Sequence, residues 1–230
     1  ASVRGDRPAI REKDLGIWQT WTWSQLLDQV RAVAGGLAAT GFKRGMNLAI
    51  IGDNRPRLYS AFAAAQSLGG VPVPLYQDAA AQEWVFVFQN AEIAFALVEN
   101  QEQVDKLLEI QPQCPQLKHI IYDDGRGLRH YTQPDLLSFE QLQEQGRAFD
   151  AAHPRFFTGE IDQGQSSDVA AMFYTSGTTG NPKGVVHTHD SLLRAARMGA
   201  EWEGLTADEE VIAYLPMAWI GQNIFSIAQA

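Results

Sequence analysis

The sequence predicts an α/β fold in which mostly parallel sheets are flanked by helices. The first observation is a series of short apolar runs, such as Asn47–Ile51 and Val71–Leu75, that have no polar face. The second is that an amphipathic or alanine-rich stretch of helical length follows each run. Strands that are buried on both faces and alternate with helices are typical of a parallel sheet covered on both sides.

The elements of this sheet can be placed in order along the chain. Alternating large apolar residues over Gly16–Trp23 predict a twisted strand pair or hairpin. Ser24 is expected to cap a helix that is apolar on one face and stops at Gly41. The alternation then continues with strands at Asn47–Ile51, Val71–Leu75, Ile93–Val98 and Lys118–Tyr122, and with helices at Arg57–Leu68, Ala79–Asn90 and Gln101–Ile110.

The second half of the chain is less regular. Asp123–Pro134 is rich in Asp, Gly and Arg and is expected to loop out at the surface, after which Ser138 is expected to cap another helix. Periodicity is lost from Asp150 to Ser167, which predicts a linker. We therefore predict a first α/β subdomain over residues 1–150, a linker over 151–167 and the start of a second subdomain over 168–230.

One stretch, Tyr174–Gly184, combines the residue types that bind phosphate. It holds three glycines, four serine or threonine hydroxyls and one lysine, directly after the apolar run Val169–Phe173. Glycines allow backbone N–H groups to turn toward one point, and the hydroxyls and the ammonium group add donors that suit a polyphosphate. The alternative is a solvated hairpin turn between two strands. Because small residues make few packing contacts, Ser176–Pro182 should be mobile without nucleotide.

This stretch does not match the P-loop of the NTPases. That motif places Lys and then Ser or Thr at the start of a helix. Here Lys183 is followed by Gly184 and by the β-branched pair Val185-Val186, so the loop should lead into a strand over Gly184–His187.

Tyr174–Gly184 resembles the phosphate-loop signature of the adenylate-forming (AMP-binding) enzymes, which include acyl-CoA synthetases, peptide-synthetase adenylation domains and beetle luciferase. Tyr214–Gly221 resembles the next motif of that family at the expected distance. Upstream, Gly52–Pro56 and Leu68–Tyr76 resemble the opening third of bacterial long-chain acyl-CoA synthetases. The resemblance covers essentially the whole chain.

The resemblance implies a two-step reaction. A carboxylic acid, fatty or otherwise hydrophobic, reacts with ATP to give acyl-AMP, and coenzyme A then takes the acyl group. Magnesium would bridge the phosphates, and Lys183 would be a catalytic residue that opposes charge on the departing pyrophosphate. The nucleotide-binding positions implied are Thr175, Ser176, Gly177, Thr178, Thr179, Gly180, Pro182 and Lys183.

The same resemblance implies that Trp219 stands at the wall of the acid pocket, with Gly221 opening space beside its ring and Met217 and Gln222 as weaker candidates. The alternative is an ordinary core tryptophan. His187 and His189 would share one face if both lay in a strand, but a zinc site needs three or four ligands and no partner cluster is visible. A strand end followed by a capped helix is the favoured interpretation. We therefore predict no metal site formed by the protein itself, with Thr188 or Asp190 capping a helix over Leu192–Trp202.

The composition of the chain limits the kinds of partner that it is expected to bind. The net charge of −9 argues against nucleic acid, which calls for a basic face. No apolar run reaches the length of about 18 residues that a membrane span needs. The single Cys114 suits a reducing compartment, and a cytoplasmic protein follows as the expectation. A homo-oligomer is left open.

Two alternatives to an acid–CoA ligase are kept: an adenylating enzyme that loads a carrier protein, and a non-catalytic nucleotide-binding or interaction module. The resemblance also implies that family members continue for several hundred residues beyond Ala230, with a C-terminal domain. We therefore expect this chain to be the truncated N-terminal part of such an enzyme, inactive by itself. Apolar surface around Val211–Ile227 would then lack its cover and favour self-association.

Overall fold

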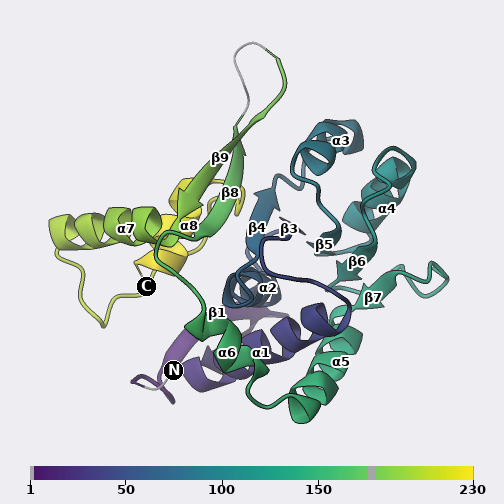
Figure 1. Cartoon of the computed structure of the whole chain (residues 1–230). Helices are drawn as coiled ribbons and strands as arrows, with labels where there is room; N and C mark the ends of the chain where they lie inside the picture. Colours follow the sequence, from purple (N-terminus) through teal and green to yellow (C-terminus); the bar gives the residue numbers. More distant parts are fainter. Residues whose placement is uncertain (1–2, 176–179, 230) are drawn as a thin grey trace.

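A five-stranded parallel sheet forms the centre of the computed structural model, which describes residues 3–175 and 180–229 (Figure 1). The strands stand in the order β4-β3-β5-β6-β7, and every neighbouring pair is parallel. Their bounds are Val71–Leu75 (β4), Asn47–Ile51 (β3), Phe95–Val98 (β5), His119–Tyr122 (β6) and Leu136–Ser138 (β7). The predicted α/β class and the four predicted strands of this sheet are confirmed.

Helices cover both faces of this sheet. One face carries α1 (Trp23–Ala39), α2 (Pro56–Ser67) and α5 (Phe139–Ala152), whereas the other carries α3 (Ala81–Asn90) and α4 (Gln101–Ile110). A 3₁₀ turn, Gln111–Gln113, extends α4.

Alternate residues of each strand divide the core into two parts. In β3, Leu48 and Ile50 pack with the α1 side, whereas Ala49 and Ile51 pack with the α3 side. Successive side chains of a strand point to opposite faces, so a strand buried on both sides must be apolar throughout.

Helix starts follow local side-chain chemistry. Ser138 caps α5 as predicted, and its hydroxyl accepts from the N–H of Gln141. The predicted cap of α1 at Ser24 is wrong, because Thr22 and Gln25 form a reciprocal capping box that starts the helix at Trp23. That helix ends at Ala39, two residues before the predicted stop.

The stretch 151–167 is more ordered than predicted. It contains the end of α5 and a short helix, α6 (Phe156–Asp162), so it is not irregular throughout, and its role as a linker stays a prediction. Phe157 is buried in the core and lies beneath the guanidinium of Arg31, which also pairs with Asp150 at 2.9 Å. Tertiary contacts of one aromatic residue therefore stabilise a helix too short to show periodicity. The division into subdomains stays a prediction.

Two antiparallel hairpins flank the sheet. The first joins β1 (Pro8–Asp14) to β2 (Ile17–Thr22), as predicted. The second joins β8 (Val169–Thr175) to β9 (Lys183–Thr188), as predicted for the phosphate loop. The chain ends with α7 (His189–Glu203), α8 (Ile220–Asn223) and a π-helical turn, Ile224–Ala228. Within the described residues, no helix has the length and apolar character needed to cross a membrane.

Close contact between α1 and α5 depends on glycine. A Cβ added at Gly146 would overlap the carbonyl oxygen of Ala32, and one added at Gly36 would overlap the carbonyl oxygen of Leu142. Gly146→Ala should therefore lower the free energy of unfolding by about 1–3 kcal/mol, as overpacking does. Urea unfolding followed by circular dichroism measures this change.

Gly159→Ala in α6 is the matched control, because a Cβ there would meet nothing within 4 Å. It should leave stability unchanged or raise it by up to about 1 kcal/mol through helix propensity. Equal stabilities for the two variants would contradict the close crossing of α1 and α5.

Candidate functional site

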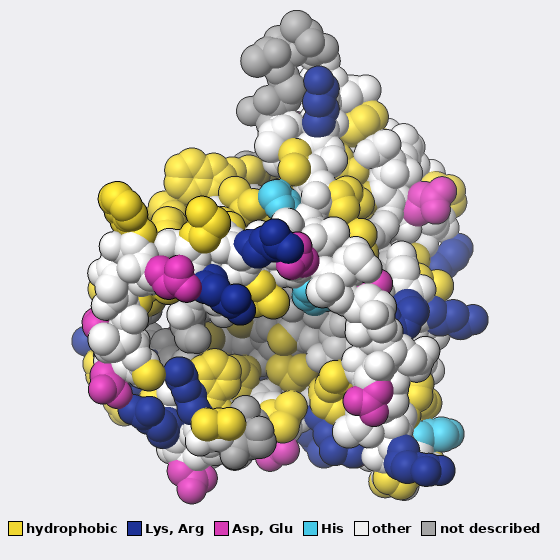
Figure 2. All heavy atoms as spheres, turned by 60° about the vertical axis from the view of Figure 1, so that its left-hand side comes forward, with side chains coloured by type: hydrophobic (Ala, Val, Ile, Leu, Met, Phe, Trp, Pro, Cys, Tyr) yellow, Lys and Arg dark blue, Asp and Glu magenta, His cyan; other side chains and the backbone are white. Residues whose placement is uncertain are grey.

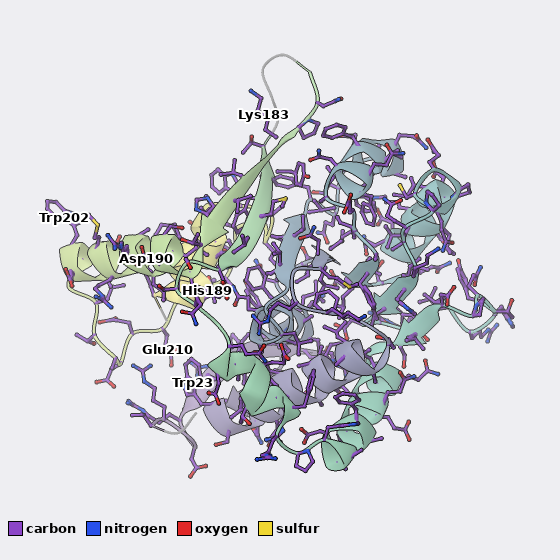
Figure 3. The ribbon with its side chains drawn as sticks, viewed as in Figure 1. Trp23, Lys183, His189, Asp190, Trp202 and Glu210 are labelled. Atoms are coloured by element: carbon purple, nitrogen blue, oxygen red, sulfur yellow. The ribbon has the colours of Figure 1, made fainter. Side chains whose placement is uncertain are left out.

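The predicted phosphate loop stands at the tip of the β8–β9 hairpin. The last residue of β8, Thr175, is paired in register with the first residue of β9, Lys183, and both side chains are exposed. Figure 3 shows Lys183 at this end of the hairpin, far from the body of α7. The structure thus brings a hydroxyl and an ammonium group together at one exposed point.

The rest of the loop is described in part. Gly180 has a φ of +125°, which favours glycine, and open space surrounds it. Pro182 is half-buried beside Lys183. Ser176, Gly177, Thr178 and Thr179 lie outside the described residues, so their predicted phosphate contacts stay predictions, as does the mobility predicted for Ser176–Pro182.

The stem of the loop is anchored to the parallel-sheet region through Tyr174. Its hydroxyl donates to Asn90 Oδ1 at 2.6 Å, at the end of α3. Its ring lies against Gly184 on the opposite strand, where an added Cβ would come within 3.2 Å of Tyr174 Cζ and 3.0 Å of Met172 Sδ. Burial raises the pKa of the Tyr174 hydroxyl.

A second anchor lies near the start of β8. Gln66 Nε2, from α2, donates to the carbonyl oxygen of Ala170 at 2.8 Å. Strand β8 runs beside β4 in Figure 1. The stem is therefore attached near both of its ends, whereas the side chains of Thr175 and Lys183 are exposed.

The predicted acid-pocket residues occupy different environments. Trp219 is 53% exposed, whereas Met217 is buried in the core on the α1 side of the sheet. A Cβ on Gly221 would meet the Phe225 ring at 3.6 Å and Leu215 at 3.9 Å, which is ordinary contact. Of these three, Trp219 alone presents a large side chain to the surface, and their pocket roles stay predictions.

The two histidines near β9 do not form a shared strand face. His187 lies in β9, with its ring edge-on to Phe173 of β8, whereas His189 is the first residue of α7. Thr188 caps that helix, its hydroxyl accepting from the N–H of Ser191 at 3.1 Å. Burial lowers the pKa of His189. Across residues 3–175 and 180–229, no group of three or more His, Cys, Asp or Glu side chains could hold a metal ion.

A polar cluster that sequence reasoning did not single out lies at the carboxyl ends of β3 and β5. Buried Glu99 accepts from the N–H of Asp53 at 2.6 Å and from Arg55 Nε at 2.9 Å. Arg55 also pairs with Glu12 of the first hairpin at 2.8 Å, and these hydrogen bonds, Glu99 first, raise the pKa of the guanidinium. In open α/β proteins, ligands commonly bind at the carboxyl ends of the parallel strands. In this chain, the charged side chains at that edge pair with one another.

Two ion pairs of Arg57 lie at the carboxyl end of β6. Arg57 donates to Asp123 at 2.9 Å and to Glu140 at 2.6 Å. Burial raises the pKa of the Asp123 carboxyl, and the nearby Arg57 opposes that effect. This carboxyl end is therefore also occupied by internal pairing.

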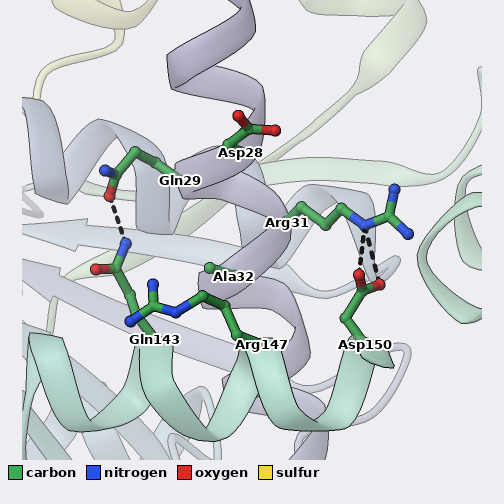
Figure 4. Close-up of a pocket in the computed structure, with 7 residues that line it drawn as sticks. All are labelled: Asp28, Gln29, Arg31, Ala32, Gln143, Arg147 and Asp150. Carbon is green, nitrogen blue, oxygen red and sulfur yellow. Dashed lines mark hydrogen bonds and ion pairs between the residues drawn. The ribbon is translucent and has the colours of Figure 1, made fainter. Parts of the chain in front are cut away.

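A groove in the surface lies away from the predicted phosphate loop. A groove of about 350 Å³ runs between α1 and α5, at the opposite end of the molecule from the loop in Figure 1. Figure 4 shows that Arg31 pairs there with Asp150 and that Gln143 donates to Gln29. Its lining is thus partly occupied by internal hydrogen bonds, and it does not join the predicted site.

Apolar side chains gather on the face that carries α7 and the C-terminal segment (Figure 2). Ile212 and Tyr214 are 80% and 76% exposed, and Trp202 of α7 is 91% exposed. The apolar exposure predicted for Val211–Ile227 is therefore present, while the self-association inferred from it stays a prediction.

A family model described as "AMP-binding enzyme" matches residues 1–229. The chain is 31% identical over 232 residues to the long-chain-fatty-acid–CoA ligase ACSBG2 of Xenopus laevis, covering 97% of this chain and 30% of that protein. It is 28% identical over 229 residues to the ligase ACSBG1 of Bos taurus, covering 97% and 31%. The chain thus spans about a third of the length of the curated relatives it matches.

Solved structures show the same fold. The A-PCP didomain of carboxylic acid reductase from Segniliparus rugosus, in complex with AMP, superposes with a TM-score of 0.76 at 20% identity, over 99% of this chain and 36% of that one. Acetoacetyl-CoA synthetase from Streptomyces lividans gives 0.75 at 20% identity, over 99% and 35%.

Tyr174→Phe tests the anchor of the hairpin stem. Loss of the hydroxyl removes the bond to Asn90 without changing the shape of the ring. The free energy of unfolding should fall by about 0.5–1.5 kcal/mol, the net value of such a hydrogen bond. Denaturant unfolding measures it, with Tyr214→Phe at an exposed tyrosine as the control. Equal stability of the two variants would show that the anchor contributes nothing.

Proposed function

The chain belongs to the AMP-binding enzyme family, and from that premise we propose that it takes part in the ATP-dependent activation of a carboxylic acid. In the first step an acid oxygen attacks the α-phosphorus of ATP, the bond to pyrophosphate breaks, and acyl-AMP forms. In the second step the thiol of coenzyme A attacks the acyl carbonyl and AMP departs. On this proposal the chain is part of an AMP-forming acid–CoA ligase.

The observation that carries this proposal is the exposed tip at which Thr175 and Lys183 face each other on paired strands. Negative charge gathers on pyrophosphate as its bond to the α-phosphorus breaks. Preorganised donors around that charge lower the barrier. A hydrogen bond from an ammonium group to a phosphate oxygen is stronger than one from a neutral hydroxyl. Ser176, Thr178 and Thr179 would add hydroxyl donors, and the glycines Gly177 and Gly180 would bring backbone N–H groups close.

The anchors of the stem support the same role. A loop that binds a polyphosphate must keep its donors directed toward one point, which a free two-stranded hairpin does poorly. Tyr174 and Gln66 attach this hairpin to α3 and α2. Magnesium would arrive bound to the nucleotide and would offset phosphate charge. The proposed roles of Thr175 and Lys183 require no metal ligand among the described residues.

The motif Tyr214–Gly221 suits a hydrophobic acid. Trp219 offers a large apolar ring at the surface, and Gly221, two residues further on, lies near Phe225 and Leu215. Met217 would support that wall from the core rather than touch the acid. The names of the relatives, long-chain-fatty-acid–CoA ligases, point to the same class of acid.

Lys183→Ala tests the catalytic role. In a full-length AMP-binding enzyme that contains this sequence, acid-dependent exchange of pyrophosphate into ATP should slow by roughly two to three decades, or about 2–4 kcal/mol. Affinity for the acid should change far less, because the ammonium group acts on charge that develops in the transition state.

Lys43→Ala is the control, since Lys43 is an exposed lysine outside the loop. An unchanged exchange rate in Lys183→Ala would remove Lys183 from the mechanism. Absence of acid-dependent exchange in the unsubstituted enzyme would favour a non-catalytic nucleotide-binding module, and transfer to a carrier protein instead of coenzyme A would favour the carrier-loading alternative.

The 230-residue chain by itself should form no acyl adenylate. The reaction needs the nucleotide, the metal and the acid within near-attack distance, and this chain contributes the phosphate loop and one wall of the acid pocket. The resemblance places the magnesium and ribose ligands and the closing domain in other parts of such enzymes. Hydroxamate trapping with ATP, Mg²⁺ and a panel of fatty and aromatic acids measures it. Abundant trapped product would show that the chain holds the whole chemistry.

A further inference from the structure

The segment that carries Trp219 has no regular secondary structure. Residues 209–219 contain neither helix nor strand, so their backbone groups need other partners. Backbone bonds supply some of them: the N–H of Trp219 donates to the carbonyl of Pro216 at 2.9 Å, the carbonyl of Trp219 accepts from the N–H of Gln222 at 3.1 Å, and the N–H of Glu209 donates to Thr206 at 3.3 Å. Side-chain amides supply four more.

Three amide side chains hold this backbone from two sides. The N–H of Leu215 donates to Gln222 Oε1 at 2.9 Å, and the carbonyl of Leu215 accepts from Asn54 Nδ2 at 2.8 Å. Asn223 Nδ2 donates to the carbonyls of Met217 and Trp219 at 2.8 and 2.9 Å. We call Asn54, Gln222 and Asn223 the amide clamp.

The amide clamp is itself held in place. Tyr59 of α2 donates its hydroxyl hydrogen to Asn54 Oδ1 at 2.8 Å and accepts from Gln222 Nε2 at 2.8 Å. Gln222 and Asn223 are only 1% and 3% exposed, and burial raises the pKa of Tyr59 to about 12. The tyrosine therefore stays protonated, and the orientation of each amide is set by its partners.

The clamp joins distant parts of the chain. Asn54 follows β3 and Tyr59 lies in α2, whereas Gln222 and Asn223 belong to α8. A segment that needed only burial could be held by apolar packing. Amides that bond to the segment at four points instead favour a single backbone position, because a shift would leave further polar groups unpaired beside Asn223 Oδ1, which is buried without a partner.

We propose that Asn54, Gln222 and Asn223, with Tyr59 behind them, are positioning residues that set where Trp219 stands and so determine which acids fit. This rests on the proposed function, since it concerns the acid pocket of that reaction. The clamp bonds to Leu215, Met217 and Trp219 and not to the β8–β9 stem, so its effect should fall on the acid and not on the nucleotide.

Two substitutions separate the parts of the clamp. Asn54→Asp keeps the acceptor for Tyr59 but loses the donor to the Leu215 carbonyl, and Tyr59→Phe removes the link between Asn54 and Gln222. The matched control is Asn47→Ala, which removes another amide-to-carbonyl bond, to Ala91, at the start of β3.

The first measurement uses the 230-residue chain. Hydrogen exchange of the Leu215 amide, followed by NMR, should become at least about fivefold faster in Asn54→Asp and Tyr59→Phe, as loss of a net hydrogen bond implies. Exchange in β3 and β5 should stay unchanged, and Asn47→Ala should leave Leu215 protected. Unchanged exchange of Leu215 in both clamp variants would overturn the clamp.

The second measurement uses a full-length AMP-binding enzyme that contains this sequence. Both clamp variants should raise KM for the acid about five- to tenfold and flatten its dependence on acid chain length, with KM for ATP within about twofold. If KM for the acid and KM for ATP rose together, the clamp would have only a stabilising role. The same would follow if activity fell in proportion to thermal stability, as expected for Asn47→Ala. Absence of acid-dependent exchange in the unsubstituted enzyme would instead refute the proposed function, and the acid role with it.

Discussion

Burial of the parallel sheet on both faces is the constraint on which the rest of the chain depends. Leu48 and Ile50 face one layer of helices while Ala49 and Ile51 face the other, and all four are essentially inaccessible to solvent. Each large aliphatic side chain buried in this way contributes about 1.5–3 kcal/mol. A sheet of this kind requires helical crossovers on both sides, and those crossovers direct the carboxyl ends of all strands to one edge.

Polar residues collect at that edge and satisfy one another there. Glu99 is almost completely buried, and an unpaired charge in that position would cost several kcal/mol. Arg55 pairs with it and also reaches Glu12, so the first hairpin is tied to the sheet. Because internal pairs occupy this edge, the exposed donors that suit a phosphate lie on a separate hairpin.

That hairpin combines a fixed stem with an exposed tip. Two strands alone are marginally stable in water, so β8 and β9 depend on their contacts with α2 and α3. The amide clamp works in a comparable way on the Trp219 segment, where side-chain amides bond to a backbone that has no secondary structure. In both places the core restricts the backbone while the side chain proposed to meet substrate stays exposed.

The sequence by itself determined the bounds of β3, β4 and α4 to the residue. Local patterns of apolar residues and the residues that end each element are enough to place those bounds. The sequence also located the two strands of the hairpin that carries the proposed phosphate loop. Tertiary structure decided the existence of α6, which depends on burial of Phe157, and the different exposures of Met217 and Trp219. It decided the clamp as well, since Asn54 and Leu215 lie 161 residues apart and no local pattern brings an amide to a distant carbonyl.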